Sequence, residues 1–196
     1  MRIRDLLAAE SIELNGSATD KKDVLNKMVD LMAKSGKINN IETYRAGVFA
    51  REEEGTTGIG EGIAIPHGKG DCVSKPGLAA MVIKNGVDFD SLDGDPVTLL
   101  FLIAAPNTED NVHLEVLSKL SMMLMDEQFT EALRNATSAE EFLSIIDKAD
   151  DERADIDEQL ADTGNAESDF KILAVTACPT GIAHTYICLL YTSPSP

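Results

Sequence analysis

The apolar positions of this chain recur with two periods, one typical of helices and one typical of strands. Thr19 is a suitable N-cap for a helix that ends before Gly36 and whose apolar stripe is Val24, Leu25, Met28, Leu31 and Met32. The same spacing predicts helices over residues 4–9, 41–53, 111–125, 127–134 and 138–146. Ser138 and Glu141 fit a capping box at the start of the last of these helices.

Apolar runs of a different kind predict the strands between these helices. The most apolar run covers residues 97–105 and is expected to be central in its sheet. Three isoleucines at 59, 63 and 65 alternate with small residues and predict a short strand, which Pro66 ends because proline has no N–H to donate. Further strands are expected at 12–14 and 78–83.

Helices that alternate with strands predict an α/β fold, in which helices flank a mixed β-sheet in a single domain over residues 1–146. The composition changes sharply after this domain. Residues 147–169 contain ten acidic and two basic residues, which supply −8 of the net charge of −17. Such a segment has too few apolar groups to fold alone, so we interpret it as an acidic flexible linker.

Composition also excludes several classes of function. A net charge of −17 repels nucleic acid, and the scarcity of aromatic residues removes the stacking surface that single strands need. The three cysteines and three histidines lack metal-site spacing, so neither a metal nor another cofactor is expected. Unpaired cysteines and the lack of a signal peptide or of a run of ~20 apolar residues predict a cytoplasmic location.

The glycine-rich stretch from Thr56 to Gly70 carries the candidate chemistry. His67 follows Pro66 directly, so we expect its side chain at a strand end where it reaches a cleft. Gly68 and Gly70 lack a Cβ atom, which lets backbone N–H groups approach an anion. An imidazole beside such donors suits a phosphoryl group. The alternative is that His67 is an ordinary exposed loop histidine.

The segment GIGEGIAIPHG, residues 58–68, resembles the phosphorylation site of fructose/mannitol-type IIA domains of the bacterial phosphoenolpyruvate-dependent sugar phosphotransferase system. The resemblance implies a phosphotransferase in which His67 accepts a phosphoryl group from the phosphocarrier HPr and passes it to a cysteine of a IIB domain. It also implies uptake of fructose or a similar sugar through a membrane IIC component.

The resemblance assigns roles to other residues as well. His113, at the start of HLEVLSKL, would orient His67 or bind the phosphoryl oxygens; alternatively, it is a helix N-terminal histidine satisfied by the backbone. Arg51 would bind the phosphate with its planar fork, or else pair with Glu52–Glu54 at a solvated helix end. Thr56 and Gly68 are further candidate phosphate-binding residues.

Residues 170–186, from FKILAVT to Tyr186, resemble the first strand and phosphocysteine loop of fructose-type IIB domains. The resemblance implies a second phosphorylation site at Cys178 in the truncated start of such a domain, and residues 187–196 are interpreted as a non-native tail. Two alternative functions remain open. One is a nitrogen-type regulatory IIA-like module whose phosphorylation state controls partner proteins, and the other is a pseudo-domain without transfer activity.

Overall fold

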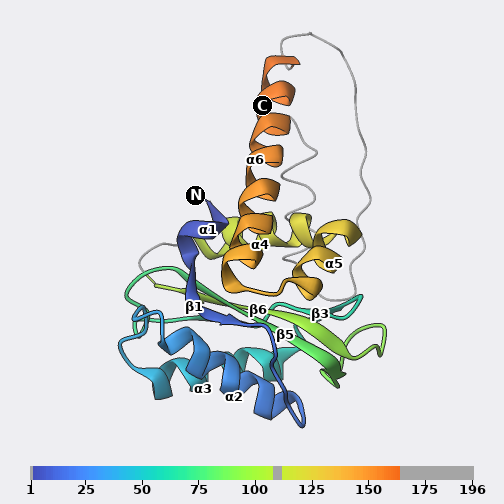
Figure 1. Ribbon diagram of the computed structural model, residues 1–196. Coiled ribbons are helices and arrows are strands. Elements are labelled where there is room, and N and C mark those ends of the chain that lie inside the picture. Colours follow the sequence, from blue (N-terminus) through green and yellow to red (C-terminus); the bar gives the residue numbers. More distant parts are fainter. Residues whose placement is uncertain (1, 108–111, 164–196) are drawn as a thin grey trace, which may run out of the picture. The chain divides into compact units, whose positions relative to one another are not determined.

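The computed structural model in Figure 1 describes the backbone of residues 2–107 and 112–163 and the side chains of 2–107 and 114–152. The chain divides into two compact units, residues 1–153 and 154–196, and the first contains every strand that the described part of the chain forms. The acidic segment 164–169, the IIB-like segment with Cys178, and residues 187–196 lie outside the described residues.

The first unit is built on a mixed sheet of six strands, which confirms the predicted fold class. The strands follow the order β1-β5-β6-β3-β2, and β4 also pairs with β6. β5 runs antiparallel to β6, β1 is parallel to β5, and β3 and β4 pair in succession with β6 in the parallel sense. The strands are β1 (Leu7–Glu13), β2 (Gly58–Gly60), β3 (Ile63–Ala64), β4 (His67–Lys69), β5 (Gly77–Val87) and β6 (Val97–Ala105).

Helices cover both faces of this sheet. α2 (Lys21–Ala33) and α3 (Ile41–Glu54) pack on one face, and α1 (Ile3–Leu6), α4 (Val112–Leu124), α5 (Glu127–Asn135) and the first turns of α6 (Ala139–Thr163) lie over the other (Figure 1). The central strand β6 serves both cores because successive side chains point to opposite faces. Phe101 packs toward α6 and Leu102 toward α2 and α3, and both are fully buried.

The glycine-rich stretch is not the single strand that the isoleucine pattern predicts. The chain reverses between β2 and β3, where Gly60, Glu61 and Gly62 all have positive φ angles of 101°, 56° and 71°. Glycine adopts this conformation without steric cost, which explains two of the three residues. Pro66 does not end the ladder, because its carbonyl accepts the Ile103 N–H at 3.0 Å and β4 continues the pairing with β6.

Helix boundaries also differ from the sequence prediction at both ends of the first unit. The predicted helix over residues 4–9 is a single turn, α1, and β1 already begins at Leu7. The helix expected to end at residue 146 continues to Thr163. Ser138 accepts the Glu141 N–H at 3.1 Å, as a capping residue does, although the Glu141 carboxylate turns to Thr137.

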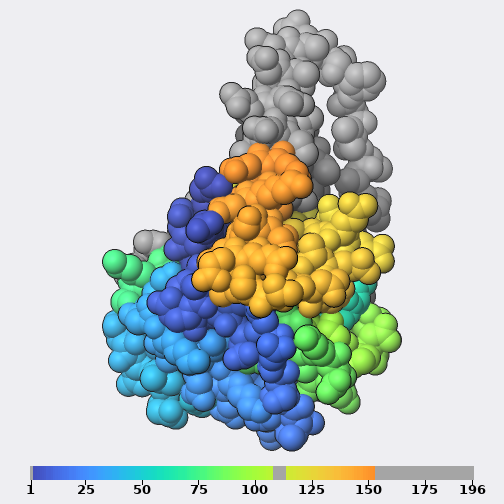
Figure 2. Space-filling model, viewed as in Figure 1, coloured from blue at the N-terminus to red at the C-terminus, as the bar shows by residue number. Residues whose placement is uncertain are grey.

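Acidic residues that composition assigns to a solvated linker are part of the first unit. Asp150 is buried, accepts the Ile3 N–H at 2.8 Å and lies 2.8 Å from the ammonium of Lys119. Asp147 and Asp151 pair with arginines of the first residues of the chain, which lie beside α6 at the surface (Figure 2). The folded unit therefore extends beyond residue 146. Within the part of the chain that the structure describes, none of the helices is long and apolar enough to cross a membrane.

Replacing Asp150 tests how firmly this end of the unit is fixed. Asp150→Ala removes the acceptor of the Ile3 N–H and a charged partner of Lys119. We expect the free energy of unfolding to fall by about 2–4 kcal/mol. Asp151→Ala is the matched control, because its ion pair with Arg2 is exposed and such pairs contribute about 0–1 kcal/mol. Urea denaturation measures both variants, and equal losses would contradict the burial of Asp150.

Candidate functional site

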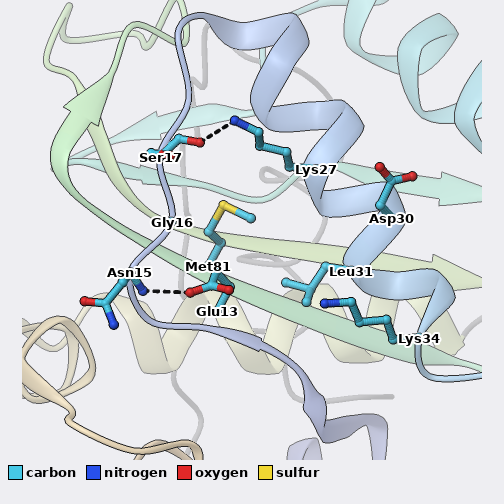
Figure 3. Close-up of a pocket in the computed structure, with 9 residues that line it drawn as sticks. All are labelled: Glu13, Asn15, Gly16, Ser17, Lys27, Asp30, Leu31, Lys34 and Met81. Atoms are coloured by element: carbon cyan, nitrogen blue, oxygen red, sulfur yellow. Dashed lines mark hydrogen bonds between the residues drawn. The ribbon is translucent and has the colours of Figure 1, made fainter.

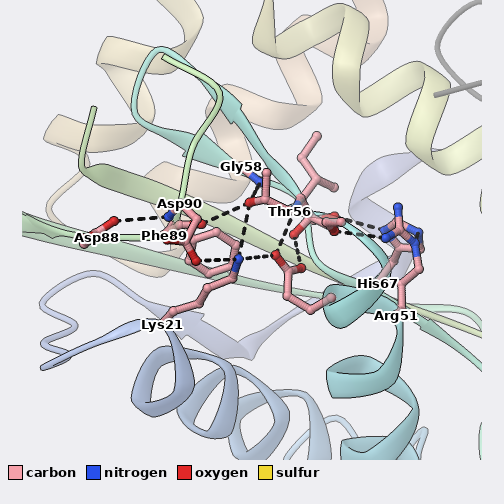
Figure 4. Close-up of polar contacts among 12 residues, drawn as sticks. Lys21, Arg51, Thr56, Gly58, His67, Asp88, Phe89 and Asp90 are labelled. Carbon is pink, nitrogen blue, oxygen red and sulfur yellow. Dashed lines mark hydrogen bonds and ion pairs between the residues drawn. The ribbon is translucent and has the colours of Figure 1, made fainter. Parts of the chain in front are cut away.

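His67 begins β4 and pairs with Ile103 of β6, and its side chain is half-buried. Its Nδ1 atom lies 3.1 Å from the carbonyl oxygen of Ile65. A carbonyl only accepts hydrogen bonds, so Nδ1 carries the proton of the neutral ring and Nε2 carries the lone pair. The Arg51 Nε–H donates to Nε2 at 3.0 Å, which agrees with this tautomer (Figure 4). Nε2 is therefore the ring nitrogen that carries the lone pair.

Arg51 reaches the ring from the last turn of α3. Its Nη1 donates to the Gly55 carbonyl at 3.2 Å, which holds the guanidinium across the end of the helix. The structure thus brings together Arg51 and His67, which are 16 residues apart in the chain. A guanidinium has five N–H donors in a fixed plane, and two of them are used in these contacts. The others suit a phosphoryl group on Nε2.

Tyr44 and Gly68 fix the backbone that carries the histidine. The Tyr44 hydroxyl donates to the carbonyl of Ile103, the residue that pairs with His67, at 2.9 Å. Burial raises the pKa of the Tyr44 phenol well above its ordinary value, so the hydroxyl keeps its proton at neutral pH. A Cβ atom on Gly68 would lie 2.8 Å from both Tyr44 and Val48. Close packing of β4 on α3 therefore requires a glycine here.

Thr56 does not fit the predicted role of a phosphate donor. Its hydroxyl donates to the Phe89 carbonyl at 3.0 Å and accepts the Gly58 N–H at 3.1 Å (Figure 4). Lys21 Nζ lies 3.4 Å from the same oxygen. Because a hydroxyl has one proton, none is left for a phosphoryl oxygen in this arrangement. Thr56 instead ties the loop after α3 to the segment that follows β5.

Sequence reasoning missed Glu52, which it placed at a solvated helix end. Glu52 is 8% exposed, and its carboxylate accepts the N–H and the hydroxyl of Thr57 at 2.9 and 2.6 Å. Lys21 Nζ lies 2.8 Å from the same carboxylate. A signal was available in the sequence: Tyr44, Val48 and Glu52 are spaced by four, which puts Glu52 on the buried face of α3.

Two other candidates, His113 and Cys178, are not fully described. His113 is the second residue of α4, but the described side chains of this helix begin at Leu114, so the predicted contact with His67 stays a prediction. Cys178 lies outside the described residues. Gly68 is beside His67, where its packing against α3 accounts for it. The described residues contain no group of three or more metal-ligating side chains.

A separate pocket of about 330 Å³ opens between α2 and the turn after β1 (Figure 3). Lys27 bridges its rim by donating to the Ser17 carbonyl at 2.7 Å, and Leu31 and Met81 form its apolar floor. None of the predicted site residues lines it. The pocket is therefore distinct from the surroundings of His67.

The fold, in which a histidine and an arginine meet beside the central strand β6, belongs to a known class of protein. Residues 5–149 match the family described as phosphoenolpyruvate-dependent sugar phosphotransferase system, EIIA 2. The match covers well over half of the chain, and the chain belongs to this family. The family predicted from residues 58–68 is thus confirmed.

Individual relatives agree with this assignment. The fructose-specific EIIABC component of Bacillus subtilis is 45% identical over 187 residues, which are 95% of this chain and 29% of that protein. The chain thus spans less than a third of the length of this relative. The crystal structure of nitrogen regulatory protein IIA-Ntr from Neisseria meningitidis is 33% identical, has a TM-score of 0.69, and matches 74% of this chain and 98% of its own.

A third relative was solved together with a partner. The structure of enzyme IIAMTL in complex with phosphorylated enzyme IIBMTL from Escherichia coli is 30% identical, with a TM-score of 0.64. It matches 73% of this chain and 99% of that chain.

Gly68 and Gly47 form a matched pair for testing the packing beside His67. Gly68→Ala places a methyl group 2.8 Å from Tyr44 and Val48, so we expect a loss of about 1–3 kcal/mol in the free energy of unfolding. Gly47 lies in α3, the helix of Tyr44 and Val48, and has open space around it. Gly47→Ala should therefore stabilise the protein by about 0.5–1 kcal/mol. Urea denaturation measures both; an unchanged midpoint for Gly68→Ala would contradict the packing argument.

Proposed function

We propose that this chain is a phosphoryl-transfer domain that accepts a phosphoryl group from phospho-HPr on Nε2 of His67 and passes it to a IIB-domain cysteine. The observation that best supports this proposal is the tautomer of His67. The Nδ1–H donates to the Ile65 carbonyl, which leaves the lone pair on Nε2 beside Arg51. A histidine used as a nucleophile must be unprotonated on the attacking nitrogen. Family membership supports the same reaction.

The transfer consists of two displacements at phosphorus. In the first, the Nε2 lone pair forms a bond to phosphorus, and the bond from phosphorus to the donor protein breaks with its electrons. In the second, a cysteine thiolate of the acceptor attacks the same phosphorus, and the P–N bond breaks so that Nε2 recovers its lone pair. Each step needs an in-line approach and donors for the phosphoryl oxygens.

The contacts of the ring assist both steps. When Nε2 is phosphorylated the imidazole becomes cationic, and the Ile65 carbonyl at Nδ1 stabilises that charge. Arg51 holds Nε2 before the reaction, and its donors then turn to the phosphoryl oxygens, where its positive charge offsets their negative charge. We assign His113, near the start of α4, as a second donor to these oxygens or to the ring.

The wider system is part of the same proposal. The Bacillus subtilis relative aligns with 95% of this chain, well beyond residue 149 where the family match ends. This supports Cys178 as the phosphocysteine of a IIB segment on the same chain, with fructose or a similar sugar as the transported substrate. The domain then works at the cytoplasmic face of a transporter that contains a membrane IIC component.

A regulatory module is the second candidate, and the resemblance to the Neisseria meningitidis nitrogen regulatory protein favours it. The match covers 98% of that protein but only 74% of this chain, so part of this chain has no counterpart in it. The alignment of the fructose-specific relative across nearly the whole chain makes transport the better supported function.

His67→Ala tests the proposed acceptor. After incubation with phosphoenolpyruvate, enzyme I and HPr, we expect the wild-type protein to gain one acid-labile phosphoryl group at His67 and the variant to gain no acid-labile label, because it lacks the Nε2 lone pair that attacks phosphorus. Mass spectrometry of the intact protein and of its peptides measures the labelling. An acid-labile label that persists on the folded variant would remove His67 from this role.

His113→Ala tests the second histidine. Loss of one donor to a transferring phosphoryl group costs about 10²–10³ in rate, so labelling of His67 should become slower by that factor while still reaching completion. Quench-flow sampling of the labelling reaction gives the rate, and thermal unfolding checks that the variant remains folded. A rate equal to that of the wild type would refute the assignment.

A further inference from the structure

Glu52 ends α3 with a carboxylate that is almost fully enclosed. Both oxygens are used: Oε1 accepts the Thr57 N–H at 2.9 Å and lies 2.8 Å from Lys21 Nζ, and Oε2 accepts the Thr57 hydroxyl at 2.6 Å. Removing water from a carboxylate costs several kcal/mol unless charges and donors replace it, and here all the replacements converge on one side chain. Such a site is specific for a carboxylate and fixes the loop after α3.

The bonds continue from Thr57 to the imidazole. The Thr57 carbonyl accepts the Ile65 N–H at 3.0 Å, and the Ile65 carbonyl accepts from Nδ1 of His67 at 3.1 Å. The carboxylate and the ring are therefore linked in series through Thr57 and Ile65. Displacement of Thr57 moves the peptide of Ile65, and with it the acceptor that holds the proton on Nδ1.

Arg51 and Glu52 are adjacent in the chain and act on opposite sides of the same ring. Arg51 binds Nε2 directly, whereas Glu52 reaches Nδ1 through the two backbone groups. Two consecutive residues of α3 are thus connected to the two nitrogens of the ring, Arg51 to the lone pair on Nε2 and Glu52 to the proton on Nδ1. Hydrogen bonds to one ring nitrogen set the tautomer and therefore the chemistry at the other nitrogen.

Lys21 supplies the charge that the enclosed carboxylate requires. It is the first residue of α2, its side chain is 20% exposed, and its ammonium also lies over the Phe89 ring at 4.8 Å. Asp90, 3.4 Å away, is the second acidic partner but is largely exposed (Figure 4). Lys21 therefore ties the loop after α3 to α2 and to the segment after β5.

We infer that Glu52 is a positioning residue for phosphoryl transfer, which holds His67 in the Nδ1–H tautomer through Thr57 and Ile65. The inference rests on the proposed function of His67. Without the carboxylate, two donors of Thr57 lose their acceptor and the Ile65 carbonyl is no longer held in line with the ring. The population of the Nε2–H tautomer then increases. In that tautomer Nε2 has no lone pair for attack, and its proton is repelled by the Nε–H of Arg51.

Glu52→Met tests this inference because methionine has a similar length and no oxygen. We expect the ¹⁵N shifts of the His67 ring to move toward the Nε2–H tautomer. The rate of labelling at saturating phospho-HPr should fall about tenfold or more, because a small misplacement of a reacting group can cost about 10²-fold in rate. The concentration of phospho-HPr at half-maximal rate should stay unchanged, because Glu52 is buried. Glu53→Met is the matched control at the next, exposed position and should change neither quantity.

Thr57 provides a second test that does not depend on the folding of the Glu52 variant. Thr57→Val removes the hydroxyl that donates to Glu52 at nearly constant volume, and Thr57→Ser restores it. Valine should move the ring shifts in the same direction as Glu52→Met, and serine should return them. Wild-type ring shifts in folded Glu52→Met or in Thr57→Val would overturn the inference. If the wild-type protein is not labelled, the proposed function fails, while the tautomer measurement still decides the role of Glu52.

Discussion

The pairing of β4 with β6 determines where the reactive imidazole lies. His67 is opposite Ile103, and the Ile103 carbonyl also accepts the Tyr44 hydroxyl, so one residue of the central strand is bound to α3 and stands beside the histidine. Gly68 allows this approach, because any side chain would collide with α3. The distance between β4 and α3 at the site is therefore fixed by the pairing with β6, the Tyr44 hydrogen bond and the absence of a side chain at Gly68.

The short strand β4 begins directly after Pro66 and places the side chain of His67 beside β6. β3 and β4 both follow the edge of β6, and Pro66 interrupts only the donor side of the ladder while its carbonyl still accepts from Ile103. Irregular backbone between the two pieces turns the Ile65 carbonyl toward the His67 ring. The same irregularity that defeats a simple strand pattern creates the acceptor for Nδ1.

Sequence reasoning succeeded where one local signal dominated. The apolar run over residues 97–105 matches β6 residue for residue, and the glycine-rich motif with His67 predicted the family. It failed where long-range contacts decide. Nothing local in the REEEGTTG run shows that Glu52 pairs with Lys21 of another helix. Asp150 is one of ten acidic residues in 147–169, and its partners Ile3 and Lys119 lie far away in the chain, so composition alone does not distinguish it.

The spacing of three residues along α3 limits how the sequence of this chain can vary. Tyr44, Arg51 and Glu52 each have a fixed target outside the helix: the Ile103 carbonyl, His67 and Thr57. An α-helix turns by about 100° for each residue, so one inserted or deleted position between Tyr44 and Arg51 would swing the guanidinium and the carboxylate away together. The length of this helix is therefore as constrained as the identity of its residues, and variation in size must fall elsewhere.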